Sequence, residues 1–125
     1  MTTKDVGDAG EAQALAHLLG QGLTLVERNY RVARGPNARG GEVDLILREP
    51  DGTVVFVEVR TRRGAAFGGA AASVGATKQR RLVLAAQHYL QRFKTLPACR
   101  FDVVTVEGQG AQARIEWFLA AFDTS

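Results

Sequence analysis

The sequence predicts an α/β protein whose mixed β-sheet is flanked by helices. Apolar residues recur at helical spacing in two stretches, residues 5–21 and 78–94, and apolar runs of strand length lie between and after them. These patterns predict the order α-β-β-β-α-β-β, which is typical of a sheet that packs helices against its faces. The length of 125 residues fits a single domain over residues 1–125.

The first helix is expected from about Asp5 to Gln21, where two glycines end it. Its apolar stripe is expected to consist of Ala12, Leu15, Leu18 and Leu19. Glu11 precedes Leu15 by four residues, so it lies on the same face as that stripe. A carboxylate on the core side of a helix either has a function or complements the positive end of the helix dipole.

Three strands are expected next, at residues 23–32, 42–49 and 53–62. The segment 34–41 is rich in Gly, Pro and Asn, which predicts a loop between the first two strands. Pro50-Asp51-Gly52 predicts a tight turn, so the second and third strands form an antiparallel hairpin.

The second half of the chain is expected to supply one helix and two strands. Residues 63–76 are rich in Gly and Ala and are predicted to form a mobile loop over the hairpin, closed by Ser73 and Val74. Thr77 is the expected N-cap of a helix from Lys78 to about Lys94. Strands at 101–106 and 115–119 complete the sheet.

The charge and the cysteine content limit the partners and the compartment. The net charge is +3, and arginine supplies 13 of the 16 basic residues. Arginine binds phosphate bidentately and stacks on bases, so this usage suits a nucleic-acid partner, although a compositional bias toward arginine explains it equally well. With Cys99 as the sole cysteine, no apolar span of membrane length and no secretory signal, the expected location is cytoplasmic, with no membrane contact.

Two acidic residues interrupt the otherwise apolar strands of the predicted hairpin. Strand alternation predicts that Asp44 shares a face with Glu42 and Ile46, and that Glu58 shares a face with Phe56 and Arg60. A carboxylate buried in an apolar strand costs several kcal/mol unless it is paired or binds a metal. If the hairpin register brings Asp44 and Glu58 together, a hard cation such as Mg²⁺ removes their repulsion. The alternative is a salt-bridged sheet face without catalytic function.

A metal at such a pair can activate water and stabilise the transition state of phosphodiester hydrolysis. Arg60 lies two residues after Glu58 on the same face, where a basic side chain can contact the scissile phosphate. Glu42 is a further candidate ligand, although its place at the start of the strand also fits an exposed residue.

Several motifs in this order resemble the YraN-like family of small bacterial proteins, and the resemblance covers nearly the whole chain. They are Gly7-Asp-Ala-Gly-Glu11-Ala, Asn29-Tyr-Arg31, Gly41-Glu-Val-Asp44-Leu-Ile, Val55-Phe-Val-Glu58-Val-Arg60-Thr-Arg62, Lys78-Gln-Arg-Arg81-Leu and Arg100-Phe-Asp-Val-Val104. That family is similar in fold to archaeal Holliday-junction resolvases and restriction endonucleases. The resemblance therefore implies a restriction-endonuclease-like mixed sheet flanked by helices.

In that superfamily, an Asp and an acidic-x-Lys triplet form the active site, often with a Glu from the first helix. The resemblance implies that Asp44 and Glu58 hold Mg²⁺ or Mn²⁺ and that Glu11 assists them. Arg60 occupies the place of the Lys, and because arginine keeps its proton it can orient a phosphate but does not serve as a general base. Lys78 is the alternative basic residue. Residues expected to contact the nucleic-acid backbone are Arg31, Arg62, Arg63, Lys78, Arg80 and Arg81.

Three functions remain open on the sequence alone. The first is a divalent-metal-dependent nuclease acting on structured or single-stranded DNA. The second is a nucleic-acid-binding protein with a degenerate, non-cleaving site, and the third is a protein–protein adaptor on the same fold. Related resolvases act as dimers because a junction has two symmetric strands to cut, so the analogy predicts a homodimer.

Overall fold

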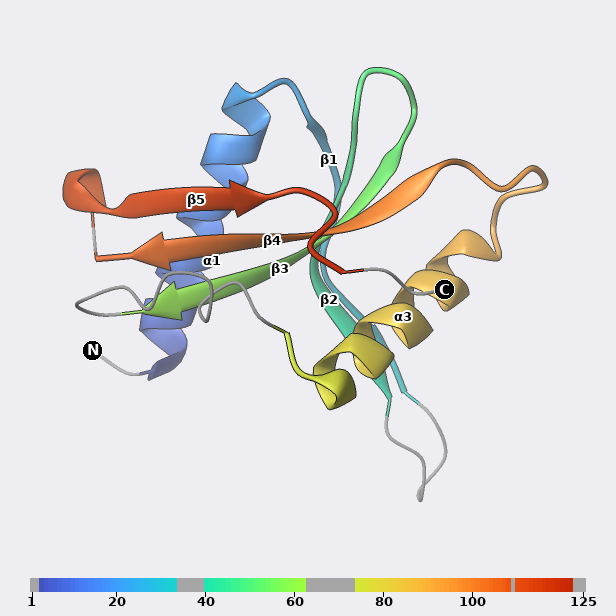
Figure 1. The fold of residues 1–125 in the computed structure, drawn as a ribbon, viewed down its shortest axis with the longest axis horizontal. Coiled ribbons are helices and arrows are strands. Elements are labelled where there is room, and N and C mark those ends of the chain that lie inside the picture. The colour runs from blue at the N-terminus through green and yellow to red at the C-terminus, as the bar shows by residue number, and fades with distance from the viewer. Residues whose placement is uncertain (1–2, 34–39, 63–73, 109, 123–125) are drawn as a thin grey trace.

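The computed structural model describes residues 3–33, 40–62, 74–108 and 110–122 (Figure 1). Its elements follow the predicted order, so the predicted α/β class is confirmed. They are α1 (Thr3–Gly20), β1 (Thr24–Val32), β2 (Gly41–Arg48), β3 (Val54–Arg62), α3 (Ala76–Leu90), β4 (Cys99–Glu107), the 3₁₀ turn η1 (Gly110–Gln112) and β5 (Arg114–Phe118).

The five strands form one open, mixed sheet in the order β1-β2-β3-β4-β5. Neighbouring strands are antiparallel except β3 and β4, which run parallel from Val54 opposite Cys99 to Arg62 opposite Glu107. A parallel pair needs a crossover connection, and α3 supplies it between β3 and β4. β3, the second strand of the hairpin that carries both predicted metal ligands, is therefore also the strand that pairs with β4.

Each of the two helices covers its own face of the sheet (Figure 1). Val55 and Val57 of β3 belong to the apolar cluster that α1 covers, whereas Phe56 between them belongs to the cluster that α3 covers. Alternation along a strand explains this division. Among the described residues, no helix combines the length and the apolar character needed to cross a membrane.

The buried face of α1 differs from the predicted stripe. Ala12 and Leu19 are exposed, and the residues that face the sheet are Gly10, Glu11, Ala14 and Leu18. Gly10 lies directly on β3, since a Cβ there would come within 2.0 Å of Thr61 Cγ2. A close helix–strand contact at this glycine rotates the helix, so the prediction of Ala12 and Leu19 as core residues was wrong.

The start of α3 also differs from the prediction. The N-cap is Gly75 rather than Thr77, it makes no side-chain capping hydrogen bond, and the helix ends at Leu90 rather than near Lys94. Residues 63–73, which include Arg63 and Ser73, lie outside the described residues. The loop expected there therefore stays a prediction. Val74 is buried in the cluster beneath α3.

Candidate metal and nucleic-acid site

The candidate site lies where β2 separates from β3. Backbone pairing joins Leu45 to Val57 and continues to Arg48 opposite Val54, but it does not extend to Asp44. Instead, the Asp44 carboxylate accepts a hydrogen bond from the Val59 backbone N–H at 2.8 Å. The Asp44 side chain thus replaces a backbone acceptor at the open end of the hairpin, beside Glu58.

The alternation predicted for β2 is interrupted at the same point. Leu45 and Leu47 pack beneath α1 and Ile46 packs beneath α3, as predicted, but Val43 belongs to the cluster beneath α3. Residues two apart on a regular strand share a face. Strand alternation predicts one face for Val43 and Leu45, and their separation into two clusters shows that this prediction was wrong. Asn29, which lies on β1 between the residues paired with them, has a positive φ of 53° and departs from regular strand geometry.

Glu58 is the buried member of the pair, with 5% of its surface exposed. Burial raises its pKa, and the neighbouring Asp44 raises it further, to about 8, although the Lys78 ammonium opposes the change. When Glu58 is ionised, its Oε1 atom is buried and has no hydrogen-bond partner among the described residues. A proton shared with Asp44, or a bound cation, would satisfy this oxygen.

Lys78 reaches the pair from the first turns of α3. Its Nζ lies 3.2 Å from Glu58 Oε2 and 3.5 Å from Glu42 Oε1. Burial alone would lower the pKa of Lys78, but the carboxylates of Glu58, Glu42 and Asp44 raise it above the ordinary value. The ammonium is therefore charged at neutral pH and offsets part of the negative charge of the pair.

Arg60 lies on β3 two residues beyond Glu58 and is half-buried, opposite Thr105 of β4 in the parallel register. It stands at the position for which the resemblance implied a lysine. The structure nevertheless brings a lysine to Glu58, because the helix after the hairpin places Lys78 there. Lys78 lies 20 positions after Glu58 in the chain and is the residue that the sequence offered as the alternative basic group.

Glu11 is buried on α1, but arginine and asparagine side chains of β1 bind it. Its Oε1 accepts hydrogen bonds from Arg28 Nη2 at 3.2 Å and from Asn29 Nδ2 at 3.1 Å. The register places Arg28 opposite Leu45 and Tyr30 opposite Val43, so Asn29 lies opposite Asp44. Glu11 is thus linked to the pair through Asn29. Across the described ranges, no three His, Cys, Asp or Glu residues are grouped closely enough to hold a metal ion.

Glu42 forms ion pairs with basic side chains of two elements, β1 and α3. It lies 3.7 Å from Arg31 Nε of β1, and 3.5 and 3.1 Å from Lys78 Nζ and Arg81 Nη2 of α3. Arg80 donates a hydrogen bond to Thr77 Oγ1 at 3.2 Å. Four of the six predicted nucleic-acid contacts therefore lie near one another. The side chain of Arg62 and the whole of Arg63 lie outside what the structure describes.

A third buried acid, Asp102 on β4, was not singled out from the sequence. It is 1% exposed and accepts hydrogen bonds from Arg100 Nε at 3.0 Å, Trp117 Nε1 at 2.9 Å and the Ala120 backbone N–H at 2.9 Å. Arg100 also pairs with Glu49. The signal that could have found Asp102 is the one that identified Asp44 and Glu58, an acid inside an apolar strand.

Together, the fold and the site define a small α/β protein that carries a buried carboxylate pair, surrounded by basic side chains, at the open end of a β-hairpin. Residues 10–106 match the profile of the uncharacterised protein family UPF0102. The chain therefore belongs to the UPF0102 family, which is the YraN-like family that its motifs predict.

Its relatives match over nearly their full length. A UPF0102 protein of Methylibium petroleiphilum is 62% identical over 125 residues, which cover 100% of this chain and 99% of that protein. Those of Polaromonas naphthalenivorans and of an Acidovorax species are 56% and 57% identical, and the matches cover 83% and 89% of those proteins. They cover 100% and 99% of this chain.

Proposed function

We propose that this protein is a divalent-metal-dependent nuclease that hydrolyses phosphodiester bonds in structured or single-stranded DNA, on a fold of the restriction-endonuclease-like type. The observation that carries the proposal is the buried Glu58 Oε1, which has no hydrogen-bond partner in the described part of the chain and lies beside the Asp44 carboxylate. A folded protein rarely leaves a buried polar atom unsatisfied without a functional reason.

The residues at this position fit Mg²⁺ or Mn²⁺. Asp44 and Glu58 offer hard oxygen donors, and Mg²⁺ commonly binds through one or two carboxylates and completes its shell with water and substrate phosphate. A third protein ligand is therefore not required. When bound, the metal would supply an activated water and would stabilise the negative charge that develops on the phosphate.

The basic side chains at the pair would bind and orient the scissile phosphate. Lys78 keeps its proton beside Glu58, and Arg60 keeps its proton in any environment, so both act as fixed positive charges. Glu11 would act indirectly, because its hydrogen bond to Asn29 holds the residue that lies opposite Asp44. In this proposal, proton abstraction belongs to neither Arg60 nor Lys78.

A second candidate function is a nucleic-acid-binding protein that does not cleave. Arg60 at the lysine position favours it, because arginine differs from lysine in geometry and cannot lose its proton. The two functions share the basic surface and differ only in whether the acid pair holds a metal and cuts DNA. The homodimer and the cytoplasmic location expected from the sequence remain predictions under either function.

Cleavage assays with Mg²⁺ and Mn²⁺ on four-way junctions, flaps and single strands test the proposal. Wild-type protein is expected to cut at least one of these substrates. Asp44→Asn and Glu58→Gln should lower the rate by about 100-fold or more, on the order of the loss of a principal electrostatic contribution. Glu116→Gln serves as the control, since this carboxylate is exposed on β5 and its ion pair within the described segments is with Arg114.

A second measurement separates the two functions without relying on activity. At 100 times its dissociation constant, Mg²⁺ should stabilise the wild-type fold by about 2.7 kcal/mol, and Glu58→Gln should remove this effect. DNA binding without cleavage or metal-dependent stabilisation would favour the non-cleaving function. A protein that neither cuts nor binds DNA would contradict both.

A further inference from the structure

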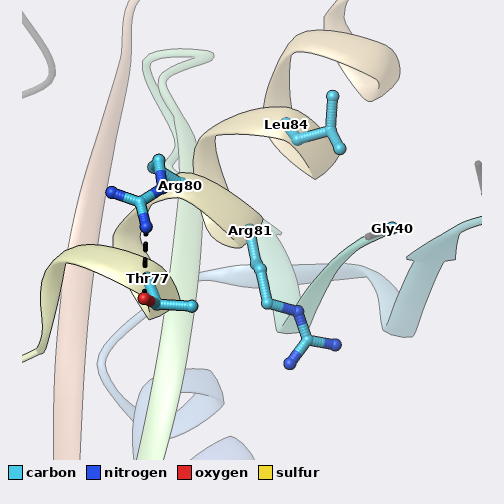
Figure 2. Close-up of a pocket in the computed structure, with 5 residues that line it drawn as sticks. All are labelled: Gly40, Thr77, Arg80, Arg81 and Leu84. Carbon is cyan, nitrogen blue, oxygen red and sulfur yellow. Dashed lines mark hydrogen bonds between the residues drawn. The ribbon is translucent and has the colours of Figure 1, made fainter. Parts of the chain in front are cut away.

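A pocket of about 460 Å³ opens beside the first turns of α3, close to the basic residues around Glu42 (Figure 2). It is lined by Gly40, Thr77, Arg80, Arg81 and Leu84. Figure 2 shows that the two guanidinium groups extend in different directions, Arg80 toward Thr77 and Arg81 away from it. The walls thus carry two cations, a hydroxyl group and one apolar side chain.

A glycine at the start of β2 allows this pocket to form against the helix. A Cβ on Gly41 would come within 2.6 Å of Arg81 O and 2.7 Å of Ala85 N, so only a residue without a side chain lets the strand lie directly on α3. Gly40, the preceding residue, is thereby held at the pocket wall. Gly41 therefore serves a packing requirement next to Arg81, whereas a Cβ on Gly40 would come within 2.1 Å of Val32 O on β1.

Positive charge exceeds negative charge around the pocket. Lys78 and Arg81 both contact Glu42 Oε1, and Lys78 also contacts Glu58, so the pocket and the acid pair lie along the same side of α3. Within the segments described, no carboxylate lies within ion-pair distance of Arg80, whose hydrogen bond goes to the neutral Thr77. The four cations Arg31, Lys78, Arg80 and Arg81 lie near the three carboxylates of Glu42, Asp44 and Glu58.

We propose that this pocket binds a phosphate group of a nucleic-acid strand, next to the phosphate that the acid pair would hold. The pocket's basic character stands on its own, whereas its place relative to a scissile phosphate rests on the proposed function. Arg80 and Arg81 provide the forked donors that suit a phosphate. Glu42 holds Lys78 and Arg81 in place until the strand arrives.

The arrangement fits a polyanion better than a single small anion. Arg31 is 74% exposed and lies on β1, across Glu42 from the helix, so the cations extend beyond the pocket on two elements. A strand carries a regular series of charges and can meet several such groups at once, with release of its counterions. Arg31 is not among the residues that line the pocket, so a strand that continues past the pocket can use this further cation.

The test compares two variants that each lose two positive charges. Arg80→Gln/Arg81→Gln changes the pocket, and Arg48→Gln/Lys94→Gln changes exposed residues at the far end of β2 and beyond the far end of α3. Affinity for a fluorescent single-stranded DNA oligonucleotide is measured by anisotropy in EDTA at several salt concentrations. The pocket variant should bind about tenfold more weakly or worse, and its log–log salt slope should be shallower by about one to two.

Equal affinities and salt slopes for the two variants would overturn the proposal. Inorganic phosphate, added at matched ionic strength, distinguishes the ligands. It should compete no better than chloride, and efficient competition in the wild type but not in the pocket variant would show a free-phosphate site instead. These binding measurements contain no divalent metal and do not depend on cleavage. If the wild-type protein cut none of the substrates in the separate cleavage assays, that result would count against the nuclease alone. A pocket variant that binds like the control would count against the pocket alone.

Discussion

Glu58 and Asp102 are both acids buried in apolar strands, on neighbouring strands of one sheet, and their surroundings are opposite. Asp102 is 1% exposed and receives hydrogen bonds from Arg100, Trp117 and the Ala120 backbone. Glu58 is 5% exposed, lies beside a second carboxylate, and keeps one oxygen without a partner in the described structure. A buried charge with all its donors stabilises the fold, whereas a buried charge without them is free to bind a ligand.

The two acids also differ in what they connect. Asp102 joins β4 to β5 and to the turn after it, through Trp117 and Ala120. Glu58 faces α3, where Lys78 covers it from the side. Removing charge should therefore damage the fold at Asp102 and spare it at Glu58, and three predictions follow from this difference.

The largest expected effect is on the stability of the Asp102→Asn variant. The asparagine side chain presents an NH₂ group to the donors Arg100, Trp117 and the Ala120 backbone N–H, from which the carboxylate accepted hydrogen bonds. Among the described residues, Arg100 keeps Glu49 as its acidic partner. We therefore expect the free energy of unfolding to fall by about 3–5 kcal/mol. Glu58→Gln should not destabilise the fold at pH 7, because the folded wild type keeps a proton on Glu58 that its unfolded state releases, and a glutamine has no such proton to release. Urea denaturation of both variants at pH 7 measures the difference. Equal losses would remove the distinction between the two acids.

The pH dependence of stability between pH 5 and 9 should be governed by Glu58. The folded-state pKa of Glu58 is raised from 4.5 to about 8, so the folded state holds a proton that the unfolded state releases above pH 4.5. The associated stability is fully present below pH 4.5 and falls as the pH rises through 8, by at most about 1.4 kcal/mol per pH unit. Urea denaturation of the wild type from pH 5 to 9 measures this slope. Glu58→Gln should flatten it, and a variant that keeps the wild-type slope would assign the titration to another group.

The smallest expected effect is on the stability of the Lys78→Met variant, which we compare with Arg100→Met. Loss of Lys78 should cost about 1 kcal/mol or less, because its side chain is 33% exposed and Glu58, with a pKa of about 8, is already protonated at pH 7. Loss of Arg100 leaves Asp102 buried as an unpaired charge and should cost about 3 kcal/mol or more. Thermal or urea unfolding at pH 7 ranks the two, and the reverse order would contradict the assignment of Asp102 as the structural acid.

Much of the fold could be predicted because its signals are local. The hairpin turn is an example: Asp51 Oδ1 accepts a hydrogen bond from the Thr53 backbone N–H at 2.9 Å, and Gly52 has a φ of +95° that glycine adopts freely. Both the hydrogen bond and the positive φ can be predicted from the local sequence Pro50-Asp51-Gly52. The buried face of α1 was not predictable in this way, because the contact between Gly10 and Thr61 joins residues far apart in the chain.

The candidate site shows the same difference between features that local sequence signals predict and features that depend on contacts between distant residues. The sequence by itself placed Asp44 and Glu58 on two strands joined by a short turn, and predicted that they meet if the hairpin register aligns them. The observed register, which pairs Leu45 with Val57, brings the two acids together. Only the tertiary structure decided which cations and donors surround each acid. It brought Lys78 to Glu58, bound Glu11 to Arg28 and Asn29, and gave Asp102 a full set of hydrogen bonds. Partners of a buried charge come from other elements, so their identity depends on packing between distant segments, which local periodicity does not encode.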